Sequence, residues 1–125
     1  MKNIYCDFSP RGSGKTSRLT KIAEELGGFY LYSWKTNYYS RKVSNNVTWL
    51  TLTNNVATAN NMCGVNIGNV YIDKGPGQED FTIGLFFEII TNPRVNDIYI
   101  AAESLHSFKP TIQEYIKENF PEYAI

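Results

Sequence analysis

The sequence predicts an α/β protein, with a mostly parallel sheet of about five strands flanked by helices in three layers. Short apolar runs alternate along the chain with amphipathic segments at helical spacing, which is the pattern of strand–helix–strand units. A glycine-rich segment joins the first apolar run to the first amphipathic segment. The length of 125 residues suits one domain, and we expect residues 1–125 to form it.

The first half of the chain is expected to hold three strands. Residues 3–8 form a largely apolar run, which predicts the first strand. Residues 16–26 carry apolar side chains at helical spacing and end at a glycine pair, which predicts a helix. The aromatic run 29–34 and the run 47–53 predict the second and third strands. A short helix is expected over residues 56–63.

The second half of the chain continues the alternation. The run 69–73 predicts a fourth strand that ends in a carboxylate, and Gly-Pro-Gly at 75–77 breaks the chain. An apolar helix is expected over 81–90, a fifth strand over 98–102 and a last helix over 111–120. Ligands of such sheets bind beyond the carboxyl ends of the strands, so we look for the site after residues 8, 73 and 102.

The glycine-rich segment, residues 9–16, reads Ser-Pro-Arg-Gly-Ser-Gly-Lys-Thr. It matches the phosphate-binding pattern Gly-x-x-x-x-Gly-Lys followed by Ser or Thr, except that Ser9 replaces the first glycine. Glycines let backbone N–H groups converge on phosphates, and the following helix adds its N-terminal N–H groups. The expected nucleotide-binding residues are Ser9, Pro10, Arg11, Gly12, Ser13, Gly14, Lys15, Thr16 and Ser17.

The strand ending at Asp73 predicts the metal site of this nucleotide. The Thr16 hydroxyl and the Asp73 carboxylate are hard oxygen ligands of the kind that Mg²⁺ prefers. Asp97 precedes the expected fifth strand and is the poorer candidate. The other interpretation of Asp73 is an ordinary strand-end residue that caps a turn.

The catalytic residues are less clearly marked. Many P-loop ATPases have a glutamate directly after the metal-binding Asp, but Lys74 stands there. Glu103 and Ser104, just after the fifth strand, are candidate sensors of the γ-phosphate. The candidate catalytic residues are Lys15 and three carboxylates that would position water, namely Glu79, Asp80 and Glu103.

The charge balance argues against a strong general attraction to nucleic acid, because twelve basic residues offset twelve acidic ones. A local basic and aromatic segment predicts either a solvated loop or a contact with DNA or RNA through charge and stacking. Its residues are Lys35, Tyr38, Tyr39, Arg41 and Lys42.

The two cysteines, Cys6 and Cys63, have no partners at metal-ligand spacing and require no oxidising compartment. No apolar run approaches the roughly 20 residues of a membrane span, and no signal peptide is recognisable. We therefore expect a cytoplasmic protein (in the host cytoplasm if it is viral) without a membrane partner.

Residues 9–16 resemble a Walker A motif, and residues 70–73 resemble a Walker B motif. With another strand between them in sequence, the chain looks like the P-loop NTPase branch of RecA-like motors and terminases. Arg11 is similar to the arginine in the loops of viral DNA-packaging ATPases. The resemblance implies ATP (or another NTP) and Mg²⁺ as ligands, and a small ATPase that acts in nucleic-acid handling or viral DNA packaging. Because Lys74 stands where the family has a glutamate, we expect weak or partner-dependent hydrolysis. Arg11 or Arg94 could reach into a neighbouring subunit if the protein is a homo-oligomer.

Two other functions remain open from the sequence. Type II thymidine kinases have a similar loop, a similar Asp strand and alanines like Ala101 and Ala102, which suggests a small nucleoside or nucleotide kinase. Against this, the chain lacks their cysteine-rich zinc segment and a carboxylate directly after Asp73. The third possibility is a non-catalytic P-loop regulator that binds a partner protein through the Tyr38-Tyr39 loop or the region 81–90.

Overall fold

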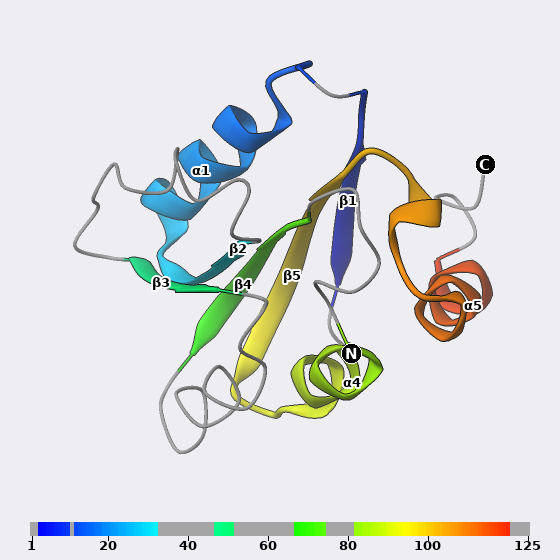
Figure 1. The fold of residues 1–125 in the computed structure, drawn as a ribbon. Coiled ribbons are helices and arrows are strands. Elements are labelled where there is room, and N and C mark those ends of the chain that lie inside the picture. The colour runs from blue at the N-terminus through cyan, green and yellow to red at the C-terminus, as the bar shows by residue number, and fades with distance from the viewer. Residues whose placement is uncertain (1–2, 11, 33–46, 52–66, 75–81, 121–125) are drawn as a thin grey trace.

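The computed structural model describes residues 3–10, 12–32, 47–51, 67–74 and 82–120 (Figure 1). The predicted helix over 56–63 and the predicted break at 75–77 lie outside these residues. In chain order the elements are β1 (Ile4–Phe8), α1 (Lys15–Leu26), β2 (Gly28–Tyr32), β3 (Val47–Thr51), β4 (Gly68–Asp73), α4 (Ile83–Thr91), β5 (Val95–Ala102), the 3₁₀ helix η2 (Leu105–Ser107) and α5 (Pro110–Asn119).

The five strands form one sheet in the order β1-β5-β4-β2-β3. Every neighbouring pair among these strands is parallel. The central strand β4 is buried on both faces over Val70–Asp73, as its apolar sequence predicts. Because the strands are parallel, the carboxyl ends of β1, β4 and β5 meet at one edge, where the glycine-rich loop begins.

Helices cover both faces of the sheet, as Figure 1 shows, with α1 on one side and α4 and α5 on the other. On the α1 face, Leu19 and Ala23 pack against the buried side chains of Tyr30 and Tyr71. On the opposite face, branched side chains of the strands meet the apolar stripes of α4 and α5 in the larger core. The predicted α/β class, with a parallel sheet flanked by helices, is therefore confirmed for the described residues.

The α1 helix ends in a turn that only glycine fits. Gly27 and Gly28 have φ angles of 74° and 126°, in the region that side chains strongly disfavour. A Cβ added to Gly28 would lie 2.1 Å from the Asn69 carbonyl oxygen. This close approach lets the chain turn from α1 directly into β2, as the glycine pair predicts.

The prediction for Asp97 was wrong, because Asp97 lies inside β5 and not before it. The strand begins at Val95, which pairs with Gly68 and is buried in the larger core. The polar residues Asn96 and Asp97 interrupt the apolar run, so the sequence pattern did not predict this extension of the strand. Asp97 still lies toward the amino end of β5, far along the strand from the glycine-rich loop.

Four tyrosines occupy the same register on adjacent strands of the α1 face. Tyr5 pairs with Tyr99, Tyr99 with Tyr71, and Tyr71 with Tyr30. Their rings are stacked, with centroid distances of 4.8, 5.3 and 6.2 Å. The Tyr71 hydroxyl also donates a 2.8 Å hydrogen bond to the carbonyl oxygen of Gly27, which fixes the end of α1 to the sheet.

Removing that hydroxyl tests this attachment. We expect Tyr71→Phe to lower the free energy of unfolding by about 1–2 kcal/mol, because the Gly27 carbonyl loses its donor while the stacked ring remains. Urea denaturation measures the change, with Tyr5→Phe as the control, because Tyr5 is the exposed residue at the end of the same row of stacked tyrosines. Equal stability losses in the two variants would contradict this role of the hydroxyl.

Candidate functional site

The glycine-rich loop follows β1 and leads into α1 at the carboxyl edge of the sheet. The Ser9 N–H donates to the Ala102 carbonyl at 3.1 Å, which continues the pairing of β1 with β5 into the loop. Gly12 and Gly14 have φ angles of 80° and 86°, so the loop path requires glycine at both positions. Arg11 lies outside the described residues.

The N-terminus of α1 presents backbone N–H groups that no side chain caps. Its N-cap residue is Gly14. The first hydrogen bond of the helix runs from the Arg18 N–H to the Gly14 carbonyl at 3.0 Å. The preceding N–H groups, of Lys15, Thr16 and Ser17, therefore have no acceptor within the helix. Such groups, together with the helix dipole, favour phosphate.

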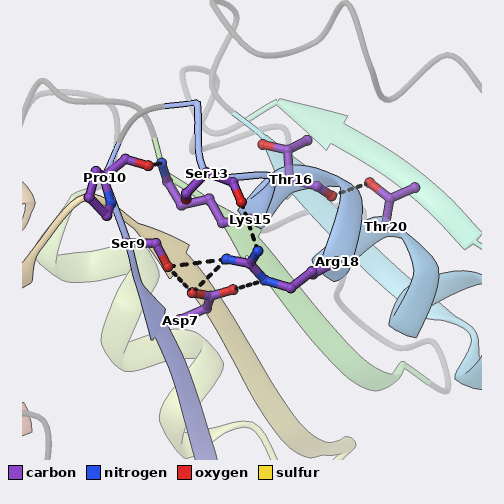
Figure 2. A network of polar contacts seen from close by, with 8 residues as sticks. All are labelled: Asp7, Ser9, Pro10, Ser13, Lys15, Thr16, Arg18 and Thr20. Carbon is purple, nitrogen blue, oxygen red and sulfur yellow. Dashed lines mark hydrogen bonds and ion pairs between the residues drawn. The ribbon is translucent and has the colours of Figure 1, made fainter.

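Lys15 is buried, with only 9% of its surface exposed, although it carries a charge. Its Nζ donates to the Pro10 carbonyl oxygen at 3.4 Å, a long bond across the loop (Figure 2). Its charge also acts, as a smaller contribution, to lower the pKa of Asp7 and of Asp73. A phosphate oxygen is a far better acceptor for this ammonium than a carbonyl oxygen.

Thr16 and Asp73, the predicted metal ligands, are brought together by the fold. The Thr16 hydroxyl donates to Asp73 Oδ1 at 3.3 Å, from the first turn of α1 to the last residue of β4. The Tyr30 hydroxyl donates to Asp73 Oδ2 at 2.8 Å. The Thr20 hydroxyl lies 3.4 Å from that of Tyr30 and donates to the Thr16 carbonyl at 2.8 Å. These four residues close a ring of contacts that ties α1 to β2 and β4.

The Thr16–Asp73 pair fits a magnesium ion held together with phosphates. No cluster of three or more His, Cys, Asp or Glu side chains occurs in the part of the chain that the structure describes. Mg²⁺ at a nucleotide needs only one or two protein oxygens, because phosphates and waters supply the rest. A carboxylate and a hydroxyl 3.3 Å apart meet that requirement.

Burial disfavours the charged form of Asp73, because only 2% of the residue's surface is exposed. Burial raises its pKa, and the hydrogen bonds from Tyr30 and Thr16, with the charge of Lys15, oppose that rise only in part. A nearby divalent cation would favour the charged form. Such a perturbed carboxylate at a loop edge is typical of a functional site.

Lys74, which follows Asp73, contacts the opposite side of the sheet. Its side chain is 3% exposed, and its Nζ lies 6.0 Å from the ring centroid of Phe108, which belongs to the larger core. Successive residues of a strand point to opposite faces, so Lys74 and Asp73 diverge. Lys74 therefore packs on the face of the sheet that carries the larger core, and its side chain does not extend toward Thr16.

Glu103 follows β5, the strand that lies between β1 and β4 in the sheet. The Ala102 carbonyl accepts from the Ser9 N–H, and the Ala101 carbonyl accepts from the Lys74 N–H at 2.9 Å. The end of β5 is thus held between the loop and the residue after Asp73. Glu103 follows this end directly and is exposed.

The remaining predicted residues divide between described and undescribed parts. The Ser104 hydroxyl accepts from the His106 N–H at 3.2 Å and so caps η2. Arg94 precedes β5 at the sheet edge opposite the loop. The others lie outside the described residues: Glu79, Asp80, Lys35, Tyr38, Tyr39, Arg41 and Lys42.

Sequence reasoning missed Asp7 and Arg18, which form an ion pair beside the loop (Figure 2). Arg18 Nε lies 2.7 Å from Asp7 Oδ2, and the guanidinium also contacts Ser9 and Ser13. The hydrogen bond from Arg18 is the main reason that the pKa of Asp7 is lowered. The available signal was a carboxylate in an otherwise apolar strand that ends at the loop.

The raised pKa of Asp73 predicts how its replacement changes stability with pH. Below the ordinary value of 3.8 the carboxyl is protonated in both states, and its burial costs little. As the pH rises through the raised pKa of Asp73 in the folded state, the unfolded state is favoured, because Asp73 ionises more readily there. We therefore expect Asp73→Asn to have a higher Tm than the wild type at pH 7, with the difference vanishing below pH 3.8.

Thermal unfolding between pH 3 and 8 measures this, with Glu24→Gln on the exposed face of α1 as a charge-matched control. An Asp73→Asn variant that is less stable than the wild type throughout this range would show that the carboxylate stabilises the fold.

Comparisons with protein-family models, with curated proteins and with solved structures found no match for this chain.

Proposed function

We propose that this chain binds a nucleoside triphosphate with Mg²⁺, as a P-loop NTPase of the RecA-like and terminase-like branch. One observation carries the proposal. The Thr16 hydroxyl at the start of α1 lies 3.3 Å from the carboxylate of Asp73 at the end of β4, beside a glycine loop that passes into a helix without a side-chain cap. These parts share one edge of a parallel sheet, where such folds bind ligands.

The strand order supports the branch. In this sheet β5 lies between β1, which precedes the loop, and β4, which ends in Asp73. A further strand between the two motif strands is the arrangement that the resemblance to RecA-like and terminase-like ATPases implies. The likeness of the loop to those of DNA-packaging ATPases favours nucleic-acid handling as the setting.

The residues of the site have distinct roles in this proposal. The N–H groups of the loop and of the first turn of α1 bind phosphate oxygens, and Lys15 neutralises their charge. Thr16 and Asp73 hold Mg²⁺, directly or through water. Held by these residues, the ion would offset the negative charge that develops on the phosphates.

Hydrolysis is expected to be slow. Lys74 occupies the place where a water-positioning glutamate commonly stands, and it packs against the core side near Phe108. Among the candidate carboxylates that the structure describes, Glu103 lies at the edge of the sheet that carries the loop. It directly follows the end of β5, whose Ala102 carbonyl accepts a hydrogen bond from the loop. We therefore assign the positioning of the attacking water to Glu103.

Nucleotide binding is tested by titrating the protein with fluorescent ATP and GTP in Mg²⁺. We expect Lys15→Ala to weaken binding at least about ten-fold, because it removes a charge-assisted bond to phosphate. Lys21→Ala, which removes an exposed lysine of the same helix, serves as the control. Equal affinities for the wild type and Lys15→Ala would overturn the proposal.

Phosphate release on the same samples tests the role of Glu103. We expect Glu103→Gln to slow release by about 100-fold or more at saturating nucleotide, the usual effect of losing a general base, while binding is retained. Glu118→Gln, on an exposed part of α5, should release phosphate at the wild-type rate. An unchanged rate in Glu103→Gln would remove this residue from the mechanism.

A second candidate function is favoured by the burial of Lys74. A P-loop protein without the usual glutamate can bind nucleotide without hydrolysing it and so control a partner protein. In that case the wild type binds nucleotide through Lys15 but releases no phosphate, and Glu103→Gln behaves like the wild type.

A further inference from the structure

We propose that the ion pair between Asp7 and Arg18 is a latch that holds the phosphate loop in its binding conformation. Asp7 and Arg18 are then positioning residues of the nucleotide site, and the inference rests on the proposed function. The latch has four members, Asp7, Ser9, Ser13 and Arg18, which Figure 2 shows around one guanidinium group.

Each nitrogen of the Arg18 guanidinium makes a separate contact. Nε and Nη2 bind the two oxygens of Asp7 at 2.7 and 3.1 Å, in the forked geometry that arginine and a carboxylate share. Nη2 also lies 3.1 Å from Ser9 Oγ, and the Ser9 hydroxyl donates to Asp7. Nη1 donates to the Ser13 carbonyl oxygen at 2.8 Å. One side chain thus ties α1 to the end of β1 and to both halves of the loop.

The bond to Ser13 sets the direction of a peptide group in the loop. The C=O and N–H of a trans peptide point in opposite directions. Since Arg18 engages the Ser13 carbonyl, the N–H of Gly14 is directed away from the guanidinium. Keeping the Ser13 carbonyl oxygen on the Arg18 side reduces its repulsion of phosphate, and it leaves the Gly14 N–H for the other side.

The exposure of the pair separates this role from a contribution to overall stability. The side chains of Arg18 and Asp7 are 50% and 34% exposed. Exposed ion pairs contribute little to the stability of a fold. A latch that orders the loop before binding contributes to affinity, because ligand binding then does not have to supply the free energy of ordering the loop. The same substitutions should therefore affect binding much more than the Tm.

Electrostatics alone makes a different prediction. The two charges lie beside a site for a polyanion, so Asp7→Asn should tighten binding and Arg18→Gln should weaken it. A latch predicts that both changes weaken binding. It also predicts that the double variant is no weaker than the weaker single variant, because either change already opens the latch.

The experiment measures affinity for Mg²⁺·ATP in five variants: Asp7→Asn, Arg18→Gln, Arg18→Lys, the double variant Asp7→Asn with Arg18→Gln, and the control Lys21→Gln. We expect the first four to bind about ten-fold more weakly than the wild type, with Tm values close to it. Arg18→Lys keeps the charge but cannot make the fork, so it should not restore binding. Tighter binding by Asp7→Asn, or additive losses in the double variant, would overturn the latch.

Hydrogen exchange without nucleotide provides a reading that does not depend on the proposed function. The Ser13 N–H is bonded within the loop to the Pro10 carbonyl at 3.2 Å. We expect its exchange to be faster in Asp7→Asn and Arg18→Gln than in the wild type and Lys21→Gln. If the wild type binds no nucleotide, the proposed function fails. If exchange in the loop is unchanged, the latch fails whatever the affinity data show.

Discussion

The hydrogen bond between Thr16 and Asp73 is the contact on which the site depends. It joins residues 57 positions apart in the chain and connects the start of α1 to the end of the most buried strand. Tyr30 completes the arrangement from β2 by donating to the second oxygen of the same carboxylate. A buried carboxylate needs such partners, because an unpaired charge there would be too costly. The same partners set the direction of its oxygens, which is what a metal site requires.

The loop is supported differently on its two sides. On the buried side, Asp73 and Tyr30 form a polar group inside the α1 face, next to the apolar contacts of Leu19 and Ala23. On the exposed side, Asp7 and Arg18 hold the loop with charges that remain in contact with water. The buried group makes the site part of the core, whereas the exposed pair acts mainly on the loop itself.

The position after Asp73 shapes the chemistry available at this edge. The chain places Lys74 there, next to Phe108 on the other face of the sheet, so this position supplies no carboxylate to the edge that carries the loop. Its backbone N–H bonds the Ala101 carbonyl, so position 74 helps to hold β5 against β4. Under the proposed function, binding and hydrolysis are separable, because Lys15, Thr16 and Asp73 come from α1 and β4 whereas Glu103 follows β5.

The sequence by itself determined the local parts of this protein. The strands and α-helices that the structure describes were predictable to within a few residues, because apolar periodicity and glycine pairs act over short distances. Lys15, Thr16 and Asp73 could be proposed as site residues from the sequence because their motifs are contiguous. Only the tertiary structure decided the strand order, and with it the partners Tyr30 and Asp7 and the place of β5 between β1 and β4. These contacts join residues distant in the chain, and a strand's pattern reveals that it is buried but not which strand lies beside it.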